Sequence, residues 1–241
     1  MVGMEGGHIV QRFDAQLSSL KGLVLEMGQL VLQQVRDAQA ALSAGDTGVA
    51  RQVIHRDRDV NAFDMKGQEL CLELLATRQP VASDLRFVMA MSQAINNLER
   101  ASDEAKKLGR TVLAVYGEGG MQPIPAIFQD SERMTELAAE QLEAALETVQ
   151  ELDVDKAVAV VQGDQLLNET FHGGLRRLAT FLFEDARNVR HVIEAVFVLK
   201  ALERIGDHAS NIAESVIYTV KGKDVRYVQA EHLSSGYLDA G

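Results

Sequence analysis

The sequence predicts an all-α protein of two tandem three-helix bundles, with six long helices related by internal pseudo-two-fold symmetry. Apolar residues recur every three or four positions along most of the chain, which is the spacing of one buried helix face. One short motif also occurs twice within matching flanks. The composition favours helix as well, since the chain has only 3 prolines, no tryptophan and 46% hydrophobic residues.

The first half of the chain contains three amphipathic segments. Gly45 is a plausible end for the first, and Asp46 is a plausible N-cap for the second. Pro80 should end the second, because proline disfavours helical geometry at the residue before it. Ser83 or Asp84 can cap the third. The expected helices are about 8–44, 46–77 and 83–117, and we assign residues 8–117 to a first repeat.

The strongest helix-breaking stretch, residues 117–125, holds three glycines and two prolines and separates the two repeats. The helical pattern then returns, with Asp153 as an N-cap. The expected helices are about 126–150, 153–182 and 188–221. We assign residues 126–222 to a second repeat and 223–241 to a flexible tail.

The duplication is visible in individual residues. The motif Leu-Glu-Arg-x-x-Asp begins at Leu98 and again at Leu202, 104 positions later. On the preceding helices, acidic and amide residues match at a constant offset of 107 positions, Asp57 and Asn61 with Asp164 and Asn168. The change of offset falls between helices, where differences in length are tolerated.

Each motif places two carboxylates four residues apart, Glu99 with Asp103 and Glu203 with Asp207. On a helix the two members of a pair share a face, and both glutamates border the apolar stripe. Oxygen-rich groups of this kind are the ligands that hard cations prefer. A solvated, self-neutralised helix face explains the same spacing, so metal binding and a plain acidic surface both stay open at this point.

The two pairs differ in the charges that follow them. Lys107 comes four residues after Asp103, an arrangement that favours an ion pair on a helix surface. No lysine follows Asp207 within a turn, and Asn211 takes the position equivalent to Lys107. We therefore expect Lys107 to compete with a cation for Asp103, and the second pair to be the more readily occupied.

Several other functions receive little support. The net charge of −11 argues against nucleic acid as a partner, and the most apolar window, residues 189–205, carries too many charges to cross a membrane. Cys71 is the only cysteine and lies in an apolar run, which favours a core position and a cytosolic protein. The chain opens with no secretory leader.

The interpretation of this protein as an enzyme depends on a single pair of residues. Glu169 and His172 have the Glu-x-x-His spacing of a di-iron bundle ligand pair. Such sites need two copies, but the equivalent positions of the first repeat are Ala62 and Met65. We expect a non-enzyme, with a metal-dependent di-iron enzyme as the alternative and a metal-free scaffold with an acidic binding surface as a third possibility.

Two longer stretches add a family resemblance. The run from Leu202 to Glu214 is similar to the signature helix of the PhoU family of phosphate-specific transport accessory proteins, and Arg78–Arg86 is typical of that family's first repeat. The resemblance covers about residues 8–222. It implies a cytoplasmic, often homodimeric regulator that represses the phosphate-starvation response (the Pho regulon) by contacting a sensor histidine kinase and the ATPase subunit of a phosphate ABC transporter.

The resemblance also implies a metal site. Family members bind iron, zinc, magnesium or manganese through Glu/Asp-x-x-x-Asp motifs, which fall here on Glu99, Asp103, Glu203 and Asp207. The first repeat departs from the family pattern in the residues after Asp103, with Lys107 where the second repeat has Asn211. Asp57 and Asp164 could add ligands, although a role on the helix surface explains them equally well.

Overall fold

The computed structural model describes residues 4–121, 124–228, 232, 233 and 238. The described part of the chain forms long α-helices and two short 3-10 turns, with no strand, so the predicted fold class is confirmed. The elements are α1 (Met4–Ala44), α2 (Thr47–Arg78), α3 (Ala82–Tyr116), η1 (Pro125–Phe128), α4 (Gln129–Glu151), α5 (Val154–Glu184), η2 (Ala186–Asn188) and α6 (Val189–Lys221).

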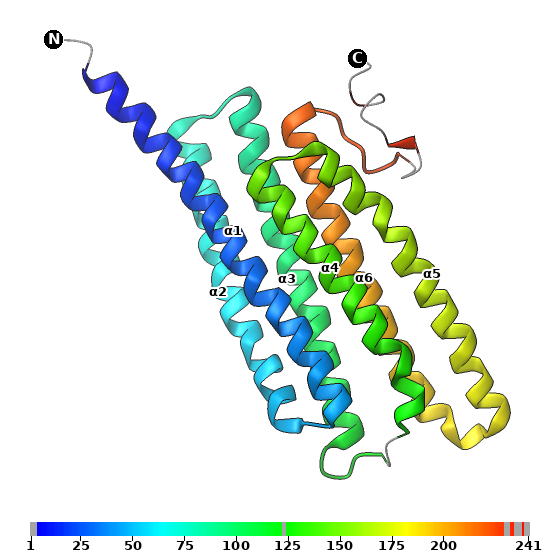
Figure 1. Ribbon diagram of the computed structural model, residues 1–241. Coiled ribbons are helices and arrows are strands. Elements are labelled where there is room, and N and C mark those ends of the chain that lie inside the picture. Colours follow the sequence, from blue (N-terminus) through cyan, green and yellow to red (C-terminus); the bar gives the residue numbers. More distant parts are fainter. Residues whose placement is uncertain (1–3, 122–123, 229–231, 234–237, 239–241) are drawn as a thin grey trace.

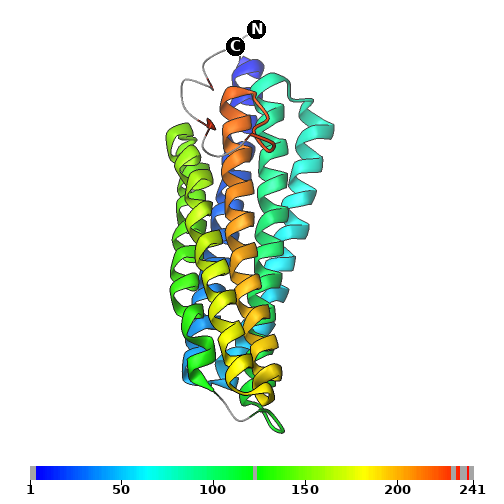
Figure 2. The same cartoon turned by 90° about the vertical axis from the view of Figure 1, so that its right-hand side faces the viewer.

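The helices form two bundles that lie side by side (Figure 1). α1, α2 and α3 make one bundle, and α4, α5 and α6 make the other. α3 packs along α6 at the centre of the molecule, and α1 contacts α4. Figure 2 shows that all of the long helices run nearly parallel to one long axis. The motif helices α3 and α6 therefore form the contact between the two repeats.

The helix ends follow from local chemistry. The Asp46 carboxylate accepts hydrogen bonds from the backbone N–H groups of Gly48 and Val49, which caps α2. Asp153 caps α5 in the same way through the Lys156 N–H. The N-caps predicted at Asp46 and Asp153 are confirmed, and they occupy equivalent positions in the two repeats. The cap predicted at Ser83 or Asp84 is wrong, because α3 already begins at Ala82 and its N-cap residue, Val81, has no side chain that can accept a hydrogen bond. α2 ends at Arg78, two residues before Pro80, as expected.

The core lies along the apolar stripes that the sequence shows. Leu98 and Leu202, the first residues of the two motifs, are fully buried. Cys71 is 3% exposed, and burial raises the pKa of its thiol to about 11. The thiolate is therefore disfavoured, as expected for a cysteine that packs in the core rather than reacts.

The predicted flexible tail is described only in part. Val225, Leu233 and Leu238 are buried, and the Gln162 amide donates a 2.9 Å hydrogen bond to the Leu233 carbonyl oxygen. These three residues therefore pack on the helices, and apart from His232 the rest of the tail from residue 229 onward lies outside the described residues. In the part of the chain that was searched, no helix combines the length and apolarity that a membrane span requires.

Candidate functional site

The first acidic pair lies on α3 and faces α2. Glu99 is half-buried, and its pKa is raised mainly by burial and then by the carboxylates of Asp103, Asp64 and Asp57. Asp64 and Asp57 belong to α2, so the contact between the two helices gathers four carboxylates. We call Asp57, Glu99 and Asp103 the first cluster.

A lysine neutralises this cluster from within. Lys106 Nζ lies 2.6 Å from Asp57 Oδ2 and 3.4 Å from Asp103 Oδ1, and the Asp57 side chain is only 6% exposed. The expectation that Lys107 would pair with Asp103 is wrong, because Lys107 Nζ lies 2.8 Å from Glu104 Oε1 instead. Lys106 points toward α2, whereas its neighbour Lys107 projects about 100° farther around the helix.

The second acidic pair lies on α6 and faces α5. Glu203 is 8% exposed, and the pKa of Asp207 is raised to about 6 by burial first, then by Glu203 and Asp164. The pKa of Asp164, on α5, is also raised, mainly by burial, although Gln141 and Asn168 donate hydrogen bonds to it. We call Asp164, Glu203 and Asp207 the second cluster.

The cations around the second cluster are arranged differently. Ser210 occupies the position equivalent to Lys106, so no ammonium group lies between Asp164 and Asp207. A lysine does precede the pair, since Lys200 Nζ lies 2.6 Å from Glu203 Oε2, one turn earlier on α6. Its side chain is 45% exposed at the edge of the cluster, and the sequence analysis overlooked it by considering only the residues after Asp207.

Each cluster is supported by a buried glutamine that the sequence analysis also missed. Gln34 donates to the Val53 carbonyl oxygen at 2.9 Å and accepts from Ser102 at 2.8 Å. Gln141, 107 positions later, donates to the Val160 carbonyl oxygen at 3.4 Å. The constant offset of 107 would have identified this pair of glutamines. They fix α1 to α2 and α4 to α5 beside the clusters.

Neither cluster has the geometry of a complete metal site. Within the described residues, no three Asp, Glu, His or Cys side chains converge as a ligand set for a metal ion. Glu203 nevertheless raises the pKa of both Asp207 and Asp164, and burial raises both further, so the three carboxylates share one partly desolvated space. Oxygen donors with excess negative charge suit a hard cation, although they do not form a finished coordination shell.

The predicted di-iron ligand pair is not assembled. Glu169 and His172 are both exposed on α5, and Glu169 accepts a 2.9 Å hydrogen bond from Gln165 on the same helix. This surface location is expected if Glu169 and His172 are ordinary polar side chains rather than metal ligands.

The centre of the molecule carries a second group of charged residues, which we call the central seam: Arg100, Glu104, Lys107, Arg204 and His208. Arg204 Nε on α6 lies 3.0 Å from Glu104 Oε1 on α3, an ion pair that lacks the alignment of a hydrogen bond. His208 Nδ1 lies 3.1 Å from the side-chain oxygen of Asn97. Burial lowers the pKa of His208 to about 4, helped by the charges of Arg100, Arg204 and Lys107.

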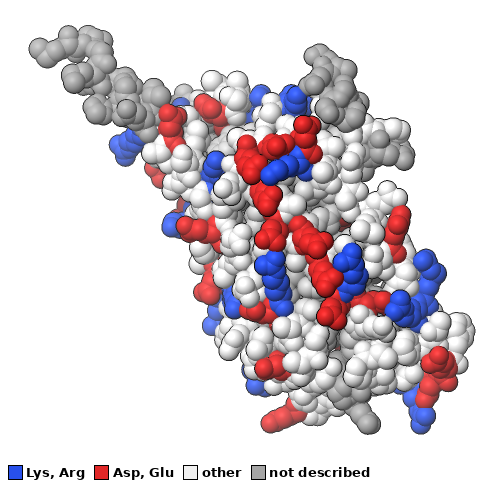
Figure 3. Space-filling model, viewed as in Figure 1, with Lys and Arg blue, Asp and Glu red and all other residues white. Residues whose placement is uncertain are grey.

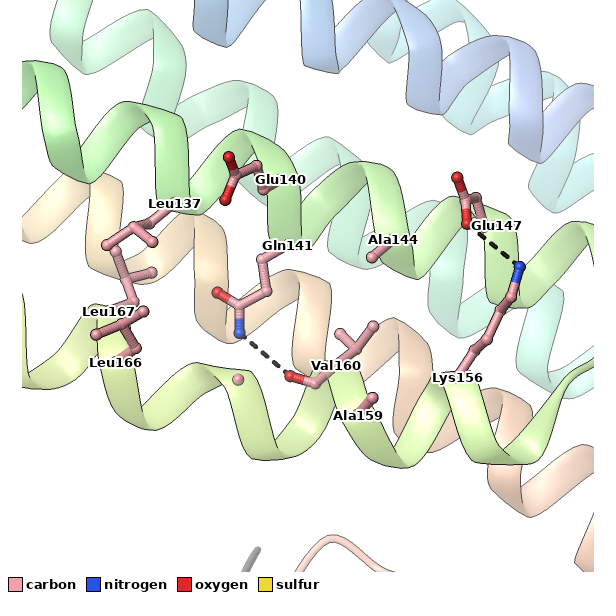
Figure 4. Close-up of a pocket in the computed structure, with 11 residues that line it drawn as sticks. Leu137, Glu140, Gln141, Ala144, Glu147, Lys156, Ala159, Val160, Leu166 and Leu167 are labelled. Atoms are coloured by element: carbon pink, nitrogen blue, oxygen red, sulfur yellow. Dashed lines mark hydrogen bonds and ion pairs between the residues drawn. The ribbon is translucent and has the colours of Figure 1, made fainter.

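Two further surface features complete the description. A groove of about 370 Å³ lies between α4 and α5, and Leu137, Val160 and Leu167 are among the residues that line it. Figure 4 shows these side chains, with Lys156 paired with Glu147 at one end. Figure 3 shows a band of acidic side chains over this face of the molecule. On α4 the acids recur every three or four residues, at Glu132, Glu136, Glu140, Glu143, Glu147 and Glu151. This face would repel nucleic acid.

Comparison with known proteins agrees with this architecture. Residues 24–112 and 131–216 each match the PhoU domain model, one match in each repeat. The phosphate-specific transport system accessory protein PhoU of Escherichia coli K12 is 37% identical over 226 residues, which is 94% of this chain and 92% of the relative. A PhoU homologue of Pseudomonas putida is 37% identical over 95% of this chain and 88% of its own length.

Solved structures give the same result. The crystal structure of PhoU from Pseudomonas aeruginosa superposes with a TM-score of 0.82 at 37% identity, over 88% of this chain and all of that one. The phosphate transport system regulatory protein PhoU from Streptococcus pneumoniae superposes with a TM-score of 0.80 at 26% identity, over 88% of this chain and 99% of that one. This chain belongs to the PhoU family.

Proposed function

We propose that this protein is a non-enzymatic, cytoplasmic regulator of inorganic phosphate uptake that represses the phosphate-starvation response while phosphate is plentiful. The observation that carries the proposal is the likeness, over 94% of the chain, to a protein named as an accessory of phosphate-specific transport. We further propose that it acts as a homodimer and contacts a sensor histidine kinase and the ATPase subunit of a phosphate ABC transporter.

Deleting the gene tests this role. In phosphate-rich medium, the deletion strain should express alkaline phosphatase constitutively, because the kinase would no longer be held inactive. Reintroducing the gene should restore repression, and reintroducing it with an early stop codon should not. Unchanged repression in the deletion strain would contradict the proposal.

We also propose that the second cluster binds a divalent cation (iron, zinc, magnesium or manganese) more readily than the first. Glu203 and Asp207 would be its ligands, with Asp164 as a candidate third. The support is electrostatic: three carboxylates share a partly buried space, and Lys200, which pairs with Glu203, lies at its rim rather than between the carboxylates. Glu99 and Asp103 are the corresponding candidates in the first cluster, where Lys106 already supplies a positive charge.

Metal content of matched variants tests the asymmetry. Glu203→Gln with Asp207→Asn should lower the bound metal in elemental analysis more than Glu99→Gln with Asp103→Asn. Ser210→Lys should also empty the second cluster, because it places an ammonium where the first repeat has Lys106. Lys106→Ser should add binding at the first cluster. Equal metal content in all four variants would show that the carboxylates are not ligands, as a metal-free scaffold requires.

A further inference from the structure

The arginine of the repeated motif lies at the central seam, and the acidic clusters do not account for it. Arg100 and Arg204 occupy equivalent positions in the two repeats, 104 residues apart. Arg204 reaches across from α6 to Glu104 on α3, which is only 5% exposed. An internal two-fold relation predicts the reciprocal contact, in which Arg100 reaches from α3 to the α6 residue equivalent to Glu104.

That reciprocal residue is not an acid. His208 stands where the symmetry requires a second carboxylate, and an imidazole cannot supply the negative charge that Glu104 supplies. After burial, the charge of Arg100 contributes most to the lowered pKa of His208, so the guanidinium lies near the imidazole. Among the described residues, Arg100 has no hydrogen bond or ion pair, so its guanidinium is left without an anionic partner.

His208 lacks a partner too. His208 Nδ1 lies beside the amide oxygen of Asn97, so Nδ1 must carry the proton and donate. In this neutral tautomer Nε2 carries no proton and can only accept a hydrogen bond. Nε2 is buried and has no hydrogen-bond partner, and the residue is 3% exposed. A buried acceptor without a donor costs free energy. This part of the seam thus lacks both an anion for Arg100 and a donor for His208.

The space beside Arg100 can hold a ligand. Arg100 lines a groove of about 980 Å³ between α3 and α6, together with the amide side chains of Gln93, Asn96, Asn97 and Asn211. We call it the polar groove. Amides in such a position can donate to oxygen atoms.

The other charges of the polar groove are largely matched. Arg226 pairs with Asp224, Arg86 donates to the Thr219 carbonyl oxygen at 3.2 Å, and Asp64 accepts from Gln68 at 3.4 Å. Glu214 lies one helical turn beyond Asn211, and its pKa is raised mainly by burial, so its carboxylate is the one that opposes an anion. At the other end, Lys107 and Arg204 are both paired with Glu104, so among the described residues Arg100 is the groove cation with neither an ion pair nor a hydrogen bond.

We propose that the polar groove binds a phosphate group at the central seam, with Arg100 as its cationic ligand and the neighbouring amides as donors. Guanidinium groups recognise phosphate oxygens through paired, charge-assisted hydrogen bonds. His208 lies behind the groove: its Nε2 is buried, and the residues that line the groove include its partner Asn97 but not the imidazole itself. The phosphate can be the free ion or a monoester, since the groove is larger than the ion alone.

This site is separate from both acidic clusters, and its test requires neither metal nor regulation. The full-length protein, treated with a chelator and kept in phosphate-free buffer at constant ionic strength, is titrated with inorganic phosphate and with phenyl phosphate in a calorimeter. We expect one site per chain for at least one of the two ligands. Binding of inorganic phosphate alone identifies the free ion, and binding of phenyl phosphate as well identifies an accessible monoester site. Failure of both ligands to bind would overturn the proposal.

Two variants and one control variant localise the site. Arg100→Gln should raise Kd about tenfold or more, as expected for losing a charge-assisted hydrogen bond. Arg110→Gln, an exposed arginine on the same helix, should leave Kd unchanged. His208→Glu should abolish binding by giving Arg100 an internal carboxylate, and circular dichroism checks its fold. Equal Kd values for Arg100→Gln and wild type would overturn the assignment.

Discussion

At the scale of single residues, one exchange separates the two acidic clusters. In the first, Lys106 lies within 2.6 Å of a nearly buried carboxylate and balances it internally. In the second, the equivalent position holds Ser210, and the lysine that pairs with the cluster is half-exposed at its edge. Exposed ion pairs contribute little because water and salt screen them. The second cluster therefore keeps an electrostatic cost that the first does not.

This cost should appear as a dependence of stability on pH. The pKa of Asp207 is raised to about 6 in the folded protein by burial, Glu203 and Asp164, against the opposing charges of Lys200 and Arg204. The folded state therefore holds this proton more tightly than the unfolded state, whose pKa is about 4. Stability from this group is fully present below about pH 4 and is lost as pH rises through about 6.

Urea unfolding in the presence of a chelator measures the effect. Wild type should lose stability relative to Asp207→Asn between about pH 4 and pH 6, and the difference should level off above that range. Asp103→Asn removes an ion pair with Lys106 instead, so it should not reproduce the trend. A constant difference between wild type and Asp207→Asn across the range would contradict the prediction.

At the scale of helices, the repeats also differ in how closely the motif helix approaches its neighbours. Gly206 follows the arginine of the second motif by two residues, and a Cβ atom there would lie 2.2 Å from Leu167 Cδ2 and 2.9 Å from Gln141 Oε1. The first repeat has Ser102 at this position, with its hydroxyl bonded to Gln34. α4, α5 and α6 thus meet at a point where no side chain fits.

Alanine at Gly206 should therefore destabilise the protein by about 1–3 kcal/mol, because overpacking forces its neighbours to move. Gly163 on α5 is a matched control, since a Cβ atom there meets nothing within 4 Å. Alanine at Gly163 should stabilise the helix by about 0.5–1 kcal/mol. Chemical denaturation of the two variants beside wild type gives both values, and the prediction fails if the two changes have the same sign.

At the scale of the whole molecule, the contact between the two repeats is symmetric in its helices but not in its charges. Glu104 on α3 and His208 on α6 occupy equivalent positions at the central seam, and only the first is an acid. A first repeat alone would expose the α3 surface that α6 covers. Two copies could cover it mutually, and each Glu104 would then face Arg100 of the other copy, as it faces Arg204 in the intact chain. Two copies of the second repeat would bring His208 against Arg204 without any carboxylate.

Fragments of the two repeats should therefore associate differently. Residues 1–121 should dimerise about tenfold or more tightly than residues 124–241, because charge complementarity is present in only one of the two interfaces. Sedimentation equilibrium measures both constants. Glu104→Gln in the first fragment should weaken its dimer toward the value of the second. If the second fragment dimerises more tightly, the seam does not govern the contact.

Much of this architecture could be predicted from local signals. The helices and N-caps depend on apolar spacing and on single aspartates, and the duplication of the motif locates the two acidic pairs. The partners of those pairs could not be predicted in the same way. Whether Lys106 or Lys107 reaches Asp103 depends on which side of α3 faces α2, and sequence distance does not contain that information. Lys200 could have been found from its spacing of three residues before Glu203, and the buried glutamines from their offset of 107, but the groups that the glutamines contact on neighbouring helices could not.

The covalent link between the repeats has a consequence for how the molecule can change over time. In a symmetric dimer of separate chains, one codon specifies both sides of the interface, so every substitution at the contact occurs twice. Here Glu104 and His208 are encoded separately. One half can keep an ion pair that secures the interface while the other gives up its carboxylate, so gene fusion allows the two sides of a single contact to be inherited independently.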